Sequence, residues 1–171
     1  MVQPIYSSGF ELQDEDTYLL TIKEVKFVEV EDKGLTAKVS NIIEEGKKTG
    51  SEFAGTLIFE SFPLYEIKGK YFGLARFFGM LVKSLDMPEK EYDNDYFNDV
   101  KKQQQVISKA PGHIYGGKAV HVKSKQSDNI FVNIKEYYTH NEYRLINDAG
   151  DKPTGSNADS PSTGAPEVEP W

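Results

Sequence analysis

Residues 18–30 of this chain read YLLTIKEVKFVEV, and the prediction of the fold begins with this stretch. Aliphatic and β-branched residues alternate there with charged ones, which predicts a long strand with one buried face. A turn at residues 32–34 (DKG) leads to a second alternating stretch, residues 35–43 (LTAKVSNII). A third, residues 52–62 (EFAGTLIFESF), ends at a proline. The three stretches predict an antiparallel meander.

The hydrophobic period then changes to that of a helix. Six apolar side chains recur at helical spacing: Leu74, Phe77, Phe78, Leu81, Val82 and Leu85. This spacing predicts an amphipathic helix that ends before Pro88. Residues 86–110 are mostly polar, and the spacing of Phe97, Val100, Gln104 and Ile107 predicts a second, short helix.

A hairpin is predicted after this polar region. Residues 118–125 (KAVHVKSK) and 130–138 (IFVNIKEYY) alternate on either side of the loop QSDN. The chain is therefore expected to be mainly β, in the order β-β-β-helix-β-β. This order matches a five-stranded OB-like Greek-key barrel with a helix between strands 3 and 4. A small β-sandwich, or an α+β sheet with a helix on one face, are the alternatives.

The composition of the chain changes after Ile146. Residues 147–171 are rich in Gly, Pro, Ser, Asn and Asp and carry a net charge of −4, which leaves −3 of the total −7 for residues 1–146. Such a segment buries too little apolar surface to offset its ordering entropy. We expect one domain over residues 1–146 and a disordered acidic tail over residues 147–171.

Composition also limits the function. The chain of 171 residues has no cysteine, so disulfides, thiolate metal sites and cysteine nucleophiles are excluded. It contains no apolar run of membrane-spanning length, and no signal peptide is expected. We expect a cytoplasmic protein without a membrane partner. The sequence leaves the formation of a homo-oligomer open.

None of the partial matches to enzyme motifs is complete. Residues 112–119 (GHIYGGKA) fit G-x-x-x-x-G-K, but Ala119 replaces the Ser or Thr that a phosphate-binding loop needs, and a strand follows instead of a helix. Residues 93–99 lack the glycine and the final glutamate of a calcium loop. The three histidines form no metal-binding spacing. We therefore expect no catalytic residue, no metal and no cofactor; a metal-dependent nuclease at residues 93–99 is the least favoured alternative.

The predicted strand faces indicate binding of single-stranded nucleic acid. In the last hairpin, Val120 and Val122 are expected to face the core, with basic and aromatic residues opposite. Lysines for phosphates and rings for bases are what a single strand requires of a sheet. The predicted contacts are Lys23, Lys38, Tyr71, Arg76, His121, Lys123, Lys125, Phe131, Lys135 and Tyr137.

The end of the tail predicts a second binding function. The only tryptophan of the chain is its last residue, and acids precede it. A large aromatic ring beside a free carboxylate suits a partner pocket with apolar and basic walls. The predicted partner-binding residues are Glu167, Val168, Glu169, Pro170 and Trp171.

These features together resemble the single-stranded-DNA-binding proteins of bacteria and phages. The resemblance rests on the OB-like body, including LIFESFP, ARFFGMLVKSL and GGKAVHVKSK, and on the acidic tip, in which Trp171 stands where bacterial members have Phe. It implies a non-enzymatic protein that protects single-stranded DNA in replication, recombination and repair, and whose tip recruits replication or recombination proteins. The rival hypothesis is a protein-interaction adaptor of a replication complex without affinity for DNA.

Overall fold

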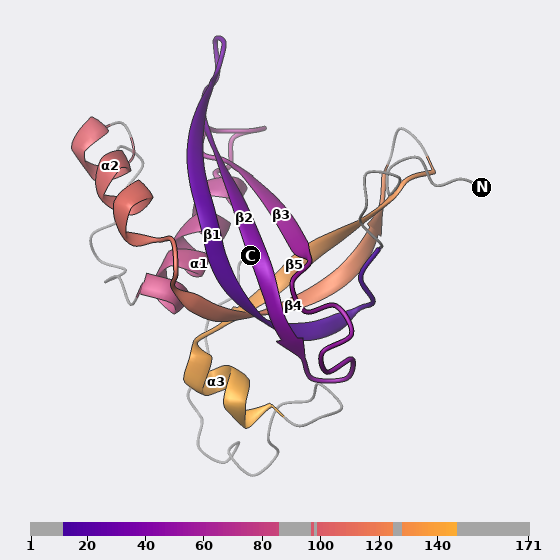
Figure 1. The fold of residues 1–171 in the computed structure, drawn as a ribbon. Helices are drawn as coiled ribbons and strands as arrows, with labels where there is room; N and C mark the ends of the chain where they lie inside the picture. Colours follow the sequence, from indigo (N-terminus) through magenta and orange to yellow (C-terminus); the bar gives the residue numbers. More distant parts are fainter. Residues whose placement is uncertain (1–11, 86–96, 98, 125–127, 147–171) are drawn as a thin grey trace, which may run out of the picture.

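Five antiparallel strands form one sheet in the order β3-β2-β1-β4-β5 (Figure 1). The computed structural model describes residues 12–85, 97, 99–124 and 128–146. The strands are β1 (Asp16–Val30), β2 (Gly34–Gly46), β3 (Leu57–Pro63), β4 (Ile114–Lys123) and β5 (Ile130–Tyr138), and the helices are α1 (Phe72–Leu85), α2 (Val100–Lys109) and α3 (His140–Leu145). The prediction of a mainly β fold with a helix between the third and fourth strands is confirmed.

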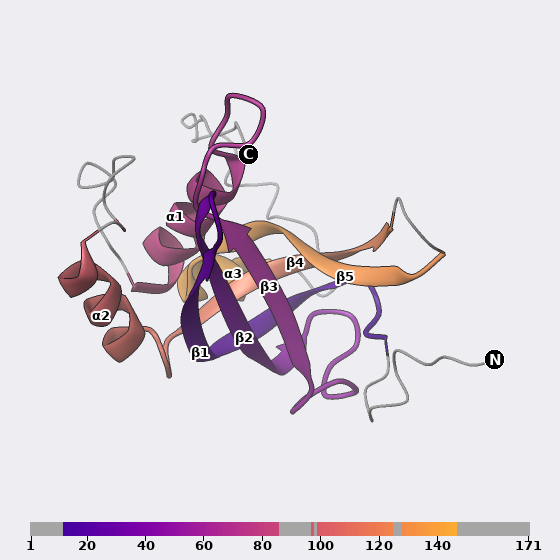
Figure 2. The ribbon, with the colours of Figure 1, turned by 90° about the horizontal axis from the view of Figure 1, so that it is seen from above.

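Strand β1 organises the sheet because it pairs with two neighbours over different lengths. Its first six residues, Asp16 to Thr21, pair with β4 on one side, while nearly all of its length pairs with β2 on the other. Bulges after Leu19 and Ile22 increase the local twist. As a result the β1–β2–β3 part and the β4–β5 hairpin diverge in direction (Figures 1 and 2).

The sheet does not close into a barrel. β3 and β5 are its edge strands, and no ladder joins them in the described part of the chain. Of the predicted five-stranded OB-like Greek-key barrel, the structure confirms the mainly β class and the five antiparallel strands, but these form an open sheet. The apolar core lies inside the curved sheet, and its fully buried members include Tyr18, Leu20, Ile22, Phe62 and Ile134.

Helix α1 packs against the inner side of the sheet through one apolar face, as its spacing predicts. Leu74, Phe77 and Leu81 are buried. The helix can approach β3 only because its second residue is glycine: a Cβ atom at Gly73 would lie 2.1 Å from the carbonyl oxygen of Pro63. The sequence position of this glycine therefore fixes how closely the helix and the strand pack.

The segment between α1 and β4 contributes a ring to the core. Phe97 is 3% exposed, and its ring centroid lies 5.5 Å from that of Phe27 and 5.3 Å from that of Phe77. Two residues later Asp99 caps α2 by accepting a hydrogen bond from the amide of Lys101. The predicted second helix is confirmed.

Helix α3 was not among the predicted elements. Thr139 and Glu142 form a capping box at its start, and the side chain of Glu142 reaches Lys83 of α1 at 3.0 Å. Tyr143 is buried against β4, where a Cβ atom at Gly116 would lie 3.0 Å from that of Tyr143. The described chain ends at Ile146, so the predicted tail lies outside the described residues. None of the described helices has the length and hydropathy to span a membrane.

Candidate functional site

The outer face of β1–β2–β3, which we call the open face, carries two lysines and one exposed aromatic ring. Two rows of cross-strand neighbours cross it: Lys26, Lys38 and Ser61 form one, and Glu24, Ser40 and Phe59 form the next. Residues paired in this way point to the same side of a sheet. In Figures 1 and 2 helix α1 lies on the other side of these strands.

Phe59 is the most unusual residue of this face because 58% of it is exposed. Its neighbours Ile58 and Glu60 point inward and are buried. The alternation of the third strand already indicated an outward position for Phe59, but the sequence prediction did not include it. Lys26 was missed in the same way.

The charge of the open face is mixed. Lys26 lies 3.6 Å from Glu24, and both side chains are at least half exposed, so the pair adds little stability. Lys38 is exposed on the neighbouring strand, and Lys23 is exposed in the β1 bulge. Lys23 and Lys38, the predicted contacts on the first two strands, are thus accessible. Lys38 lies on the open face, and Lys23 lies beside it.

The β4–β5 hairpin differs from the prediction in which residues share a face. Val122 pairs with Phe131, so these side chains lie on one face, where they are 43% and 47% exposed. On β4, Ala119 rather than Val120 faces the core. The prediction that the valines and Phe131 lie on opposite faces of the hairpin is therefore wrong. The residues of β4 that face the core are Tyr115 and those in alternation with it, such as Ala119, rather than Val120 and Val122.

The basic residues of this hairpin lie in three places. Lys123 is exposed near the tip, 3.6 Å from Asp128, and Lys135 is exposed at a bulge of β5. His121 instead contacts the N-terminal segment: its Nε2 lies 2.7 Å from the carbonyl oxygen of Gln13. Lys125 lies outside the described residues.

A buried polar network fills the gap between the two edge strands. We call it the seam; its residues are Asn41, Glu60, Arg76, Tyr115 and Tyr137. The Tyr137 hydroxyl donates to Glu60 Oε1 at 2.6 Å, and the Tyr115 hydroxyl donates to Glu60 Oε2 at 2.8 Å. Asn41 Nδ2 donates to the same Oε2 at 3.0 Å.

Arg76 joins the seam to the backbone of β5. Its Nη2 donates to the carbonyl oxygen of Ile134 at 2.9 Å and to the Tyr137 hydroxyl at 3.1 Å. The same nitrogen lies 3.9 Å from Glu60 Oε1. Side chains from β3 and α1 therefore hold β5 where a closed barrel would have backbone hydrogen bonds.

Burial dominates the electrostatics of the seam. It raises the pKa of Glu60, although hydrogen bonds from Tyr137 and Tyr115 and the charge of Arg76 act in the opposite direction. Burial, with the Glu60 charge nearby, also raises the pKa values of Tyr115 and Tyr137 well above the usual value. Both tyrosines are therefore neutral hydrogen-bond donors.

Two predicted nucleic-acid contacts, Arg76 and Tyr137, belong to this seam rather than to an exposed face. The β5 bulge at Lys135 explains the position of Tyr137, because one extra residue reverses which side chains point inward. The remaining predicted aromatic, Tyr71, is half-buried just before α1, where it lines a cavity.

No cluster of three or more metal-ligating residues occurs within the ranges that the structure describes. Of the acids proposed for a nuclease, Asp99 serves as a helix cap, and residues 93–96 lie outside those ranges. The predicted partner-binding residues 167–171 also lie outside them.

Comparison of the sequence with protein-family models finds no matching family, and comparison with curated proteins finds no match.

Proposed function

We propose that this protein binds single-stranded DNA without base specificity and without catalysis, with the open face as its central contact. The observation that carries the proposal is Phe59, which is 58% exposed on the outer side of the edge strand β3 and one row away from Lys26 and Lys38. Lysines neutralise phosphates, and an exposed ring stacks on any base at about 1–3 kcal/mol per base.

The strand order supports an OB-like reading of the fold. In OB-folds, partly open five-stranded barrels, oligonucleotides bind on the face of strands 2 and 3 and on the loops between strands 1 and 2 and between strands 4 and 5. The open face lies on β2 and β3, and the β4–β5 hairpin adds Phe131, Lys123 and Lys135 at its exposed end. In this proposal the seam replaces the ladder that closes such a barrel.

The proposed biological role is protection of single strands during DNA replication, recombination and repair, in the cytoplasm. The acidic tip, residues 167–171, would recruit replication or recombination proteins through Trp171 and its neighbouring acids.

The test is fluorescence anisotropy with a labelled dT oligonucleotide of about 30 nucleotides at several salt concentrations. The logarithm of affinity should fall with the logarithm of salt concentration, with a slope near −0.7 per phosphate contact. The double variant Lys26→Ala/Lys38→Ala should reduce the steepness of this slope by about 1.4. Phe59→Ala should weaken binding about 5- to 150-fold, the equivalent of one stacked base.

A matched control removes the same charge elsewhere. Lys101→Ala/Lys109→Ala changes two exposed lysines of α2, a helix that lies outside the open face and whose Val106 belongs to the core. This double variant should bind like the wild type apart from a small long-range charge effect. Absence of binding by the wild type at low salt would refute the proposal and favour the adaptor hypothesis. Equal losses in both double variants would refute the open face as the site.

A further inference from the structure

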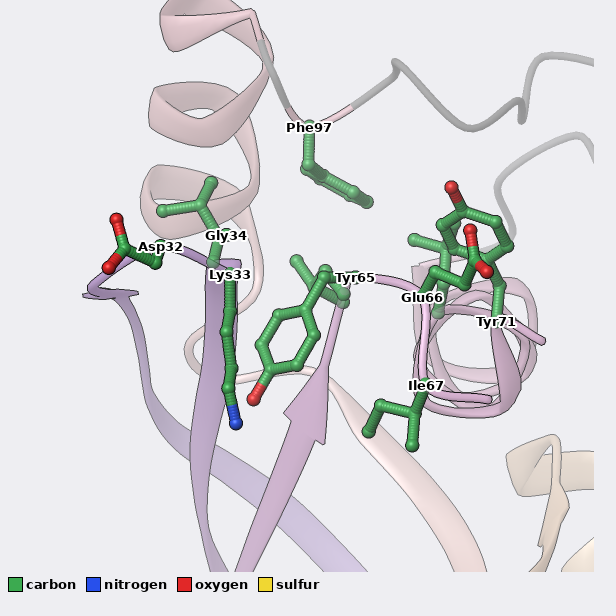
Figure 3. A pocket seen from close by; sticks show the side chains of 11 residues that line it. Asp32, Lys33, Gly34, Tyr65, Glu66, Ile67, Tyr71 and Phe97 are labelled. Carbon is green, nitrogen blue, oxygen red and sulfur yellow. The ribbon is translucent and has the colours of Figure 1, made fainter. Parts of the chain in front are cut away.

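A cavity of about 540 Å³ opens at the end of the sheet where the β1–β2 turn meets the start of α1. Figure 3 shows the rings of Tyr65 and Tyr71 on opposite sides of it, with Phe97 across one end. Its volume lies within the usual range of small-molecule pockets, about 300–1,000 Å³. The cavity is independent of the seam, whose residues do not line it.

Local sequence explains why both tyrosines line this cavity. Chain direction changes after β3, and the Leu64 amide donates to the Leu35 carbonyl at 2.8 Å. Gly34 has a φ of +144°, and a Cβ atom there would lie 3.1 Å from that of Tyr65, so only glycine leaves room for this ring. The Tyr65 ring is thereby packed against the β1–β2 turn.

A tight turn then returns the chain to the cavity. Ile67 and Lys70 exchange both backbone hydrogen bonds, at 2.8 and 3.0 Å. The two residues between them, Lys68 and Gly69, have positive φ values of 52° and 80°, as in a type I′ turn. This reversal returns the chain to the cavity, where Tyr71 also lines the wall.

The chemistry of the lining suits a flat, partly polar ring. Leucines and Phe97 form the apolar part of the lining, and the tyrosine rings supply two aromatic surfaces. The apolar members are the buried Leu64, Leu74 and Phe97 and the half-buried Leu35. A phosphate would lie near the carboxylates of Asp32 and Glu66, which line the cavity together with Lys33. An aromatic ring would stack on the tyrosines and displace water from the apolar interior.

Charged side chains at the rim of the cavity can favour one nucleobase over another through hydrogen bonds. Lys33 lines the cavity, and Lys68 and Lys70 are exposed on the adjacent turn, where they can contact a phosphate. Glu66 also lines the cavity and offers a carboxylate acceptor. Among pyrimidine bases, cytosine has an amino group that donates to such an acceptor, whereas thymine has none.

We infer that this cavity holds one unstacked nucleobase of a bound single strand, inserted between Tyr65 and Tyr71, and that Glu66 gives it a preference for cytosine over thymine. The inference rests on the proposed function, because Tyr65 follows by two residues the end of β3, the strand that carries Phe59. It adds a limited base preference to binding that is otherwise independent of sequence.

The experiment is an NMR titration of ¹⁵N-labelled full-length protein with deoxycytidine 5′-monophosphate. We expect saturable shifts of the backbone amides in residues 64–71. The affinity obtained from them should be at least twofold higher for deoxycytidine 5′-monophosphate than for thymidine 5′-monophosphate. Deoxyribose 5-phosphate, which lacks a base, should shift these amides much less than either nucleotide does. Glu66→Gln should abolish the preference between the two nucleotides.

Two aromatic variants test the stacking without creating a cavity. Tyr65→Leu and Tyr71→Leu keep an apolar side chain and should each lower the affinity for the nucleotide at least fivefold. Tyr71→Phe keeps the ring and should retain the wild-type affinity. Equal shifts from the sugar phosphate, or unchanged affinity in both leucine variants, would overturn the inference. Shifts caused by N-acetyltryptophanamide but not by the nucleotide would also overturn it and assign the cavity to a protein side chain.

The dT anisotropy measurement on the same sample separates this inference from the proposed function. Tight dT binding together with an unresponsive cavity would overturn only the base pocket. Loss of both signals would overturn the pocket together with the proposed function.

Discussion

Replacement of Glu60 by Gln should make the protein more stable at neutral pH, and the gain should depend on pH in a defined direction. Glutamine matches the protonated acid in shape and charge, so the two proteins should have similar unfolding free energies below about pH 4.5, the ordinary pKa of the side chain. Because burial raises the pKa of Glu60 in the folded state, the folded protein holds this proton more tightly than the unfolded chain does.

The sign and size of the effect follow from this difference. A raised carboxyl pKa contributes stability below the unfolded-state pKa, and this contribution is lost as pH rises through the folded-state pKa. Between the two values the wild type should lose about 1.4 kcal/mol per pH unit relative to Glu60→Gln. The structure limits the total, because Tyr137, Tyr115 and Arg76 all favour the ionised carboxylate.

The assay is urea unfolding followed by circular dichroism, at half-unit steps from about pH 4 to about pH 8, for the wild type and Glu60→Gln. Glu66→Gln, at an exposed glutamate, is the control for the same chemical change outside the core. If Glu60→Gln is instead less stable than the wild type, by a margin that grows with pH, then the seam favours the charged form. The hydrogen bonds and the charge of Arg76 would then outweigh burial in setting the pKa of Glu60.

Other predictions concern the packing of single residues. Gly73→Ala should lower the unfolding free energy by about 1–3 kcal/mol, because its Cβ would lie 2.1 Å from the Pro63 carbonyl oxygen; a thermal midpoint equal to that of the wild type would contradict this close approach. Asp16→Asn should cost about 1–3 kcal/mol and speed hydrogen exchange at Lys48 and Thr49, whose amides donate to the Asp16 carboxylate; unchanged exchange would show that the loop holds without it.

Hydrophobic periodicity alone determined the main elements of this protein. The meander, the amphipathic helix and the final hairpin were all predicted, because each has a period that neighbouring residues set locally. Polar content likewise predicts a tail over residues 147–171, which lie outside the described residues. Lys38 and Phe131 were correctly expected to be accessible, since alternation puts both on outward positions of strands.

The tertiary structure decided what depends on contacts between distant residues. Alternation puts Glu60 on the same face of β3 as Ile58 and Phe62, but the partners that satisfy a buried carboxyl group lie between 16 and 77 positions away, on four other elements. A single bulge at Lys135 turned Tyr137 inward, and the faces of β4 follow from the packing of Tyr115 rather than from the valines. The cavity between Tyr65 and Tyr71 likewise requires the β1–β2 turn, the start of α1 and Phe97 to meet. Period determines which residues can share a face, but burial against the rest of the chain determines which face becomes the core.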